Sequence, residues 1–530
     1  MNYRKVFVFI LLISLVLLLA ANCRQRNSAV VTIALDSEFT SLDFLGGKSV
    51  PASAERIRSL IFNTLVKKNE KFDYIGELAK DIKDLDGGST ISFTLQDNVK
   101  FHNGAVLKAA DVKYTFEKLQ SAEGASKAAS FYETVDGQKK PHIVAIETPD
   151  DKTVNFKISR PTLKNQLLSN MVAIPIIAEG TFETQKDKPV GTGAYKFVKA
   201  DMVQNTVDLE AFNECWEGAP KIQKLLVKVV KDSNAVQAEL KSGQVDIAPT
   251  MINLSPDTIQ NLGKDPNLKA DPFDSANVQL LTINLSAAPL DNIKVRQAIA
   301  YGVDRENIIK EMLLGQGKIA HSILPQESWA YSPGVIYSHD AAKAKQLLDE
   351  AGFKDPDGDG PQMRFAAPIR LSISAGNSSQ SQYSQIIQNQ LKEVGVPIEI
   401  VPVEFSALTE QWRLGQFQIT MNRWVGGNQD PIFYKDLFHS AESTDVKPTA
   451  RNRSRYKNPE FDKIIEAAMN ELDREKAKVL YKQAQDIISR DLPILPLWYP
   501  SNMVVYNKRI SGMQINASAD WFFVRSLSVN

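Results

Sequence analysis

The feature that most constrains the fold is a strand, helix, strand succession between residues 371 and 400. Two short runs of alternating apolar residues enclose apolar residues at helical spacing, and Gly395 ends the helix. The apolar positions are Leu371 and Ile373, then Ile387, Leu391 and Val394, then Val396, Ile398 and Ile400. Strands joined by a crossover helix run parallel, so we expect a parallel, helix-covered sheet here.

The same alternation of strands and helices continues along the chain, whose 530 residues exceed what one hydrophobic core organises. Ile91, Phe93 and Leu95 alternate after a glycine turn, as in a strand. Asp340 and Asp473 each precede an apolar stripe at helical spacing, and such stripes are expected in the core rather than around a cofactor. The pattern predicts an α/β protein with two or more lobes.

The N-terminus differs in composition from the rest of the chain. Arg4 and Lys5 precede an apolar run, residues 6–21, that only Ser14 interrupts. A basic start followed by a short apolar run is typical of a secretory signal. The run is shorter than the ~20 residues that a membrane span needs, which favours the signal over an anchor.

The residues that follow this run indicate a lipoprotein. Residues 19–23, Leu-Ala-Ala-Asn-Cys, resemble the lipobox of bacterial lipoproteins, although Asn22 replaces the usual small residue. This resemblance implies that residues 1–22 are a signal peptide and that Cys23 carries a lipid. We therefore expect a membrane-anchored protein in the periplasm or at the cell surface.

Charge and cysteine content exclude several classes of function. Lys and Arg number 62, as do Asp and Glu, so no basic footprint for nucleic acid exists. The two cysteines are Cys23 and Cys215, and a lipidated Cys23 leaves no disulfide framework and no thiolate metal cluster. Cys215 is expected to be a small core residue, with a reactive thiol as the alternative.

Motifs that would indicate catalysis or a metal site are missing. No two histidines lie within a helical turn of each other, and neither a G-x-S-x-G elbow nor a P-loop occurs. Residues 355–360 imitate the start of an EF-hand, but the twelfth position is Ala366, which cannot supply the bidentate carboxylate. Carboxylates are plentiful, so their number alone leaves a glycosidase pair open. No cofactor or metal is expected.

Several segments, in order along the chain, resemble family 5 of the bacterial extracellular solute-binding proteins, the dipeptide-, oligopeptide- and nickel-binding type. They are SLD at 41–43, VKFHNG at 99–104, ADVKYT at 110–115, GTGAY at 191–195, NECWEGAP at 213–220, LKSGQVD at 240–246, VRQAI to DR at 295–305, the helix at 344–353 and LPILPL at 492–497.

The resemblance implies a periplasmic-binding-protein-like α/β fold, with two main lobes, a hinge and an inserted third domain. The implied domains are domain I, a discontinuous unit of 29–63, 187–276 and 499–530; domain II, the insertion 64–186; and domain III, residues 277–498. The solute would lie between domains I and III.

The implied function is the substrate-binding component of an ABC importer. It would capture a small solute, peptide or peptide-like, close its lobes on it and deliver it to a membrane permease. The chain is expected to be a monomer and not an enzyme. The alternatives are a surface lipoprotein that senses a solute or presents peptides, and a secreted hydrolase that has adopted the fold.

In the family, one strand of domain III pairs with the backbone of an extended ligand, which implies a site at Asn422, Arg423 and Trp424. Peptide-binding members place an Asp three residues after the Trp, where it meets the ligand's ammonium group, but here that position is Gly427. Asp430 matches a later landmark of the family. An ordinary peptide N-terminus would therefore be buried without its usual partner, at a high cost in free energy.

The resemblance also implies contacts from the other side of the cleft. Val50 matches a position that pairs with ligand backbone, and Lys48 lies two residues before it. Phe131 and Tyr132 would line the cleft from domain II. Each of these residues could instead be surface or core packing. Arg423 and Lys48 together favour an anionic group on the solute.

Overall fold

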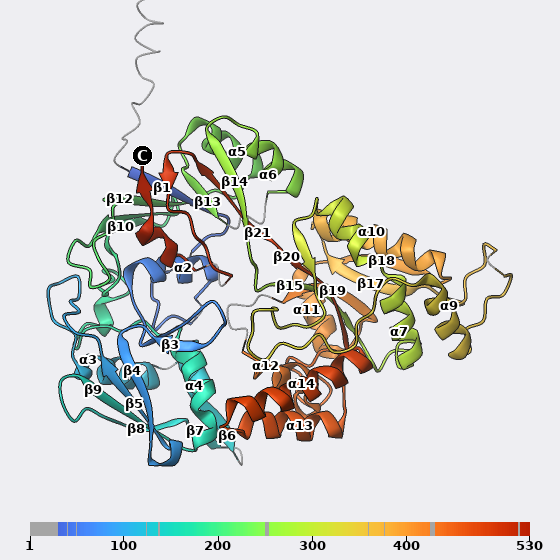
Figure 1. Cartoon of the computed structure of the whole chain (residues 1–530), viewed down its shortest axis with the longest axis horizontal. Coiled ribbons are helices and arrows are strands. Elements are labelled where there is room, and N and C mark those ends of the chain that lie inside the picture. The colour runs from blue at the N-terminus through green and yellow to red at the C-terminus, as the bar shows by residue number, and fades with distance from the viewer. Residues whose placement is uncertain are drawn as a thin grey trace, which may run out of the picture.

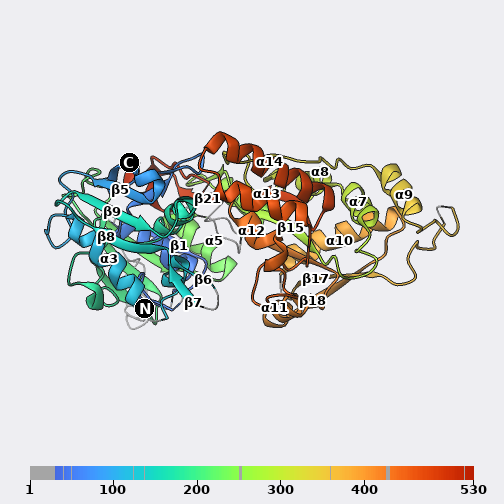
Figure 2. The ribbon, with the colours of Figure 1, turned by 90° about the horizontal axis from the view of Figure 1, so that it is seen from below.

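The computed structural model describes residues 30–39, 41–48, 50–122, 124–135, 138–249, 254–358, 360–375, 377–424, 430–517 and 520–530. The described chain forms two lobes that lie side by side (Figures 1 and 2). We call the part before residue 274 and after residue 501 the first lobe, and residues 278–500 the second lobe. The predicted signal and Cys23 lie outside the described residues.

The first lobe is built on a seven-stranded mixed sheet in the order β10-β11-β12-β1-β13-β21-β14. β1 runs parallel to both of its neighbours, whereas β11 and β21 pair antiparallel with theirs. The strands are β1 (Val30–Leu35), β10 (Tyr195–Asp201), β11 (Thr206–Ala211), β12 (Lys224–Val229), β13 (Ile247–Pro249), β14 (Leu268–Phe273) and β21 (Asn502–Asn507).

Helices cover both faces of this sheet, which explains why β1 is almost entirely apolar. Ile33 and Leu35 share a core with α2, while Ala34, which lies between them, shares one with α5 and α6. These helices are α2 (Ala52–Ile61), α5 (Ser233–Ser242) and α6 (Pro256–Gly263), and a terminal pair, β22 (Ile510–Ser511) and β23 (Ser528–Val529), closes the lobe.

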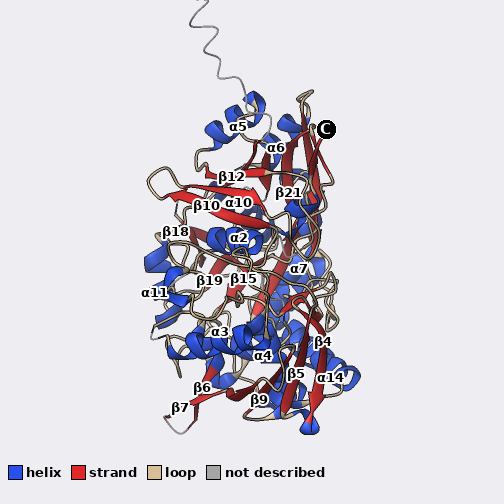
Figure 3. Ribbon diagram, turned by 90° about the vertical axis from the view of Figure 1, so that its left-hand side faces the viewer, coloured by secondary structure: helices blue, strands red, loops and turns tan. Residues whose placement is uncertain are grey.

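A four-stranded antiparallel sheet, in the order β4-β5-β9-β8, completes the first lobe and lies below the seven-stranded sheet in Figures 1 and 3. Ile91, Phe93 and Leu95 are fully buried on it, as their alternation predicts. The elements of this part are β2 (Val66–Lys68), β3 (Tyr74–Gly76), β4 (Ala79–Leu85), β5 (Thr90–Leu95), α3 (Ala109–Ser121), β6 (Tyr132–Val135), β7 (Gln138–Pro141), β8 (Ile143–Glu147), β9 (Thr153–Ile158) and α4 (Lys164–Met171).

The second lobe is built on a six-stranded mixed sheet in the order β16-β20-β15-β19-β17-β18. β17 and β18 pair in parallel, with α10 as their crossover, so the predicted strand, helix, strand unit is confirmed. The strands are β15 (Val278–Ile283), β16 (Gly317–Ile319), β17 (Ile369–Ser374), β18 (Ile398–Val403), β19 (Ile419–Trp424) and β20 (Ile494–Pro500).

Helices again cover both faces of the sheet. The neighbouring residues Leu280 and Leu281 on β15 point to opposite faces, and each is buried in a different hydrophobic core. Asp340 and Asp473 cap α9 and α14 through the backbone N–H groups of Lys343 and Lys476, as predicted. The helices are α7 (Ile293–Gly302), α8 (Arg305–Asn307), α9 (Ala341–Glu350), α10 (Ser378–Glu393), α11 (Phe405–Leu414), α12 (Phe433–Phe438), α13 (Pro459–Asn470) and α14 (Arg474–Asp491).

The chain crosses between the lobes twice, from β14 to β15 and from β20 to β21. β14 and β21 remain paired up to Phe273 and Asn502, and β16 pairs with β20 up to Pro500, so both sheets extend to the crossings. Lys318 on β16 also forms an ion pair with Asp274 of the first crossing at 2.7 Å. No described helix is long and apolar enough to span a membrane.

Candidate functional site

The predicted ligand strand is β19, which lies in the middle of the second lobe's sheet beside β15. Asn422 stands opposite Leu280, and its side chain exchanges hydrogen bonds with the Thr282 hydroxyl at 3.2–3.3 Å. Gln279 donates to the Asn422 carbonyl at 2.9 Å. These bonds fix the strand segment from which Arg423 and Trp424 project.

A cavity of about 650 Å³ opens along this segment, within the size range of small-molecule sites. Asn422, Arg423 and Trp424 all line it, so the structure brings these three predicted residues together. The other lining residues belong to the second lobe as well: Leu280, Thr282, Ile323, Ser374, Gln380, Phe405, Trp412, Met421, Phe433, Leu437, Phe438, Arg451, Arg453, Ser454 and Ile494.

Aromatic rings form much of the wall. Trp424 and Phe433 meet edge to face with ring centroids 5.8 Å apart, and Phe405 meets Trp412 in the same way at 6.1 Å. Offset and edge-to-face ring pairs are favourable arrangements that hold each ring in place. The cavity therefore presents a largely fixed apolar surface to a solute, with polar and charged side chains at a few places in its wall.

Arginines supply the charge of the cavity. Arg453 stacks over the Trp412 ring at 4.0 Å, and Arg451 lies 5.7 Å from the Phe433 centroid. Burial, together with the nearby charge of Arg451, lowers the pKa of Arg453 to about 10. Arg423 is exposed to solvent but lies in the recess, where desolvation lowers its pKa.

The sequence did not single out Arg451, Arg453 or the rings of Trp412 and Phe433 as site residues. Arg451 and Arg453 precede α13 in a stretch rich in charge, which reads as a solvated loop. Only the packing of this loop against α11 and α12 brings their guanidinium groups to β19. The spacing Arg-x-Arg was the one available signal.

Asp430, in contrast, is turned toward the first lobe. It is 7% exposed and accepts hydrogen bonds from the Ile432 N–H at 2.9 Å and from the Tyr74 hydroxyl of β3. Burial lowers the pKa of Lys68 on the adjacent β2 to about 8, with Asp430 opposing the shift. Asp430 thus forms a contact between the two lobes. Gly427, the position at which peptide-binding members have an Asp, lies outside the described residues.

The first-lobe residues predicted for the site are not among those lining this cavity. Lys48 is exposed and lies near Gly124, and Val50 packs against the first lobe's core. Phe131 is fully buried in that core, with its ring 5.7 Å from Phe116. Tyr132 is half-buried, donates to the Gln120 carbonyl at 3.1 Å and carries Lys139 over its ring.

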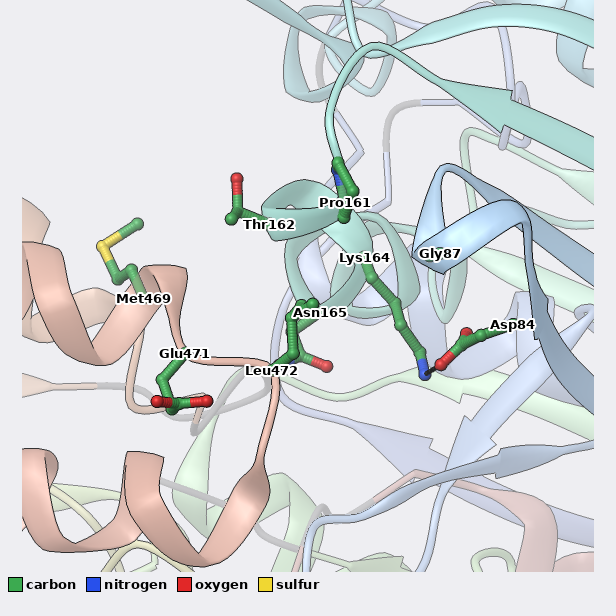
Figure 4. Close-up of a pocket in the computed structure, with 10 residues that line it drawn as sticks. Asp84, Gly87, Pro161, Thr162, Lys164, Asn165, Met469, Glu471 and Leu472 are labelled. Carbon is green, nitrogen blue, oxygen red and sulfur yellow. Dashed lines mark hydrogen bonds and ion pairs between the residues drawn. The ribbon is translucent and has the colours of Figure 1, made fainter.

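A second, smaller cavity of about 270 Å³ marks where the lobes approach each other away from the crossings. Figure 4 shows Asp84 and Lys164 of the first lobe, paired at 2.6 Å, facing Met469, Glu471 and Leu472 of the second. Asp84 and Lys164 already pair with each other within the first lobe, and the cavity is less than half the volume of the one along β19. It is therefore a less suitable solute site than the cavity along β19.

Possible metal ligands, the free cysteine and the acidic segment at residues 355–360 are further candidates for a functional site. The described residues contain no cluster of three or more His, Cys, Asp or Glu side chains that could hold a metal ion. Cys215 is buried, which raises the pKa of its thiol and agrees with a core residue. Asp355 accepts from the N–H of Gly358 at 3.0 Å, as in an acidic turn.

Comparison with known proteins shows the family to which this chain belongs. A model described as "Bacterial extracellular solute-binding proteins, family 5 Middle" matches residues 73–445, well over half of the chain. The chain belongs to this family. Its fold class is therefore the two-lobed, periplasmic-binding-protein-like fold predicted from the sequence, and the proteins of this family bind solutes outside the cytoplasm.

Named relatives match this member of the family almost end to end. The oligopeptide-binding protein AppA of Bacillus subtilis (strain 168) is 29% identical over 480 residues, 88% of this chain and 86% of that protein. The dipeptide-binding protein of Escherichia coli (strain K12) is 28% identical over 499 residues, covering 90% and 89%. The solved structure of AppA from Bacillus subtilis with a nonapeptide has a TM-score of 0.70 at 26% identity, over 94% of this chain and 99% of that one.

Proposed function

We propose that this family 5 member is the substrate-binding component of an ABC importer and captures a peptide or peptide-like solute for a membrane permease. The similar proteins named above are oligopeptide- and dipeptide-binding proteins, and they align with this chain over nearly its whole length. The family and the relatives named above are described as binding proteins, and on this basis we propose that the chain is not an enzyme.

The cavity along β19 carries this proposal. It is large enough for a small solute and has aromatic walls and a few polar groups. Its lining includes Trp424, the last residue of β19, which precedes by six residues the Asp430 that contacts Tyr74 of the first lobe. A solute seated there would lie near the lobe boundary. Contacts to both lobes would then favour a closed form, which the permease could recognise.

The domain boundaries predicted from the sequence are proposed on the same grounds. Domain I would be 29–63, 187–276 and 499–530, domain II 64–186, and domain III 277–498. The two crossings, near residues 273–278 and 500–502, supply a double connection about which lobes can hinge. A monomer suffices for this mechanism.

We also propose that Cys23 anchors the protein in a membrane through a lipid, which keeps it near its permease and raises its effective concentration. Wild type should incorporate labelled palmitate and fractionate with membranes, whereas Cys23→Ser should incorporate none. A wild-type protein that stays unlabelled in the soluble fraction would refute the anchor without affecting the binding function.

A thermal-shift screen tests the function. Peptides of two to nine residues, amino acids and sugars would be added to the purified protein, and the solute recovered afterwards would be weighed by mass spectrometry. We expect a peptide or peptide-like solute to raise Tm by mass action and to be recovered intact. Stabilisation by sugars alone would reject the peptide class, and recovery of a cleaved solute would favour the hydrolase alternative.

A further inference from the structure

The cavity along β19 gathers positive charge without a balancing carboxylate in its wall. Its charged lining residues, among those the structure describes, are Arg423, Arg451 and Arg453. Among the described residues, the carboxylate that pairs with one of these arginines is that of Asp436, 3.8 Å from the Arg451 guanidinium, a distance longer than a hydrogen bond. Asp436 can offset one of the three charges at most, so the cavity carries a net positive charge.

The guanidinium groups are available as donors. Neither Arg423 nor Arg453 forms a side-chain hydrogen bond or ion pair with another described residue. The Arg453 guanidinium carbon lies over the Trp412 ring, 4.0 Å from its centroid, a contact that holds the group in place. Stacking uses the face of the planar group and leaves its N–H edge free for a bidentate contact to an oxyanion.

An ammonium group has no comparable partner nearby. The sequence between Trp424 and Asp430, Val-Gly-Gly-Asn-Gln, contains no acid, and the Asp430 carboxylate already accepts hydrogen bonds from Tyr74 and Ile432. A cationic solute would therefore bring a further positive charge close to the three arginines, at a free-energy cost that a recessed site increases.

On the basis of the proposed function, we infer that the solute is an acidic peptide-like molecule whose oxyanion, a carboxylate or a phosphate, is held by Arg453 together with Arg451 or Arg423. The aromatic walls of Phe405, Trp412 and Phe433 would take its apolar part. An anion here relieves the repulsion between Arg451 and Arg453 as well as gaining charge-assisted hydrogen bonds.

Calorimetry with probes that share the Ala-Phe-amide body and carry different charges at its N-terminal end tests this inference. The probes are succinyl-Ala-Phe-amide, acetyl-Ala-Phe-amide and Ala-Phe-amide, with charges of −1, 0 and +1 by construction, and the protein is the full-length chain in mild detergent. We expect the succinyl probe to bind about ten- to a hundredfold more tightly than the acetyl probe, and the free amine to bind most weakly. A phosphonoacetyl probe separates the oxyanions, since tighter binding than succinyl favours phosphate.

Variants connect the preference to the arginines. Arg453→Gln should lower the succinyl-to-acetyl affinity ratio by about tenfold, and so should either Arg451→Gln or Arg423→Gln, whichever removes the second contact to the oxyanion. Arg413→Gln is the matched control, because Arg413 lies on α11, is paired with Glu410 at 2.7 Å on the surface and does not line the cavity. It removes the same charge and should leave the ratio unchanged.

The outcomes separate this inference from the proposed function. Equal affinity for the succinyl and acetyl probes, or a ratio that none of these cavity arginine variants changes, overturns the anionic solute. Failure of all three probes overturns it as well, and the thermal-shift screen then shows whether other peptides bind. A chain that binds sugars but no peptide fails both proposals.

Discussion

His102 links two segments of the first lobe through both nitrogens of its ring. Nε2 donates to the Gly193 carbonyl at 2.9 Å, and Nδ1 accepts from the Gly191 N–H at 3.3 Å. This arrangement requires the neutral ring, because a proton on Nδ1 would face another donor. Burial accordingly lowers the pKa of His102 to about 4.

The lowered pKa predicts a pH dependence of stability. Between pH 6.5 and 4 the unfolded chain binds a proton that the folded chain does not, so the free energy of unfolding falls as pH falls through this window. The contribution of His102 is fully present above about pH 6.5, is lost below about pH 4 and amounts to about 3 kcal/mol. Urea denaturation at pH 7, 5.5 and 4 measures it.

Two variants isolate this histidine from the carboxylates, which also titrate in acid. His102→Gln should be less stable at pH 7 and should lose less stability than wild type between pH 6.5 and 4. His339→Gln, at an exposed histidine, should follow wild type. Parallel pH profiles for wild type and His102→Gln would show that protonation of His102 is not linked to unfolding.

At the binding cavity, the sequence predicted only those lining residues that lie next to one another in the chain. Asn422, Arg423 and Trp424 are consecutive on one strand, and their resemblance to the family's ligand strand identified them. Arg451 and Arg453 reach the same cavity from a loop about thirty residues further on, through contacts with Trp412 and Phe433. Such packing leaves no period in the sequence, so it could not be read from the chain.

At the scale of elements, the segment Gly191-Thr192-Gly193 is explained by close approach of two backbones rather than by a ligand. The Gly193 N–H donates to the Ile61 carbonyl at the end of α2 at 2.8 Å. A Cβ on Gly193 would lie 2.6 Å from Ile61 C and from Leu60 O, and one on Gly191 would lie 2.2 Å from Ile61 O. An added Cβ would therefore press on the backbone at the end of α2 and tend to separate it from the segment that leads into β10.

Gly193→Ala should therefore lower the free energy of unfolding by about 1–3 kcal/mol, as overpacking at a rigid site does. Gly263→Ala is the control, because a Cβ there would lie 3.2 Å from the Ala270 Cβ and 4.0 Å from the Ala270 N, and alanine favours the helix α6. Equilibrium denaturation measures both. A Gly193→Ala protein as stable as wild type would mean that the α2 backbone yields.

Elements with a clear period were the most predictable part of the fold. β17, α10 and β18 form the predicted parallel unit, and the aspartates before α9 and α14 cap those helices. The strand orders of the larger sheets were not available from local patterns, because β21 joins β13 and β14 from more than 200 residues away. The family resemblance, rather than periodicity, supplied that long-range architecture.

For the whole molecule, function depends on how the lobes meet. Two crossings connect them at one side, and Tyr74 with Asp430, and Asp73 with Arg474, connect them elsewhere. The Asp73–Arg474 ion pair involves an exposed arginine and is individually weak, whereas the Asp430 carboxylate of the other contact is buried. Opening of the lobes would have to break these few polar contacts, and closing would form them again. A solute that bridges both lobes would shift this equilibrium toward the closed form by its differential affinity.

Small-angle X-ray scattering during a titration tests this account most directly. The solute is the one that raises Tm most in the thermal-shift screen, added up to saturation at a fixed protein concentration. The account predicts a radius of gyration that decreases with the same midpoint as binding, because the lobes close on the solute. A solute that saturates the protein and raises Tm while the radius of gyration stays unchanged would contradict capture by lobe closure.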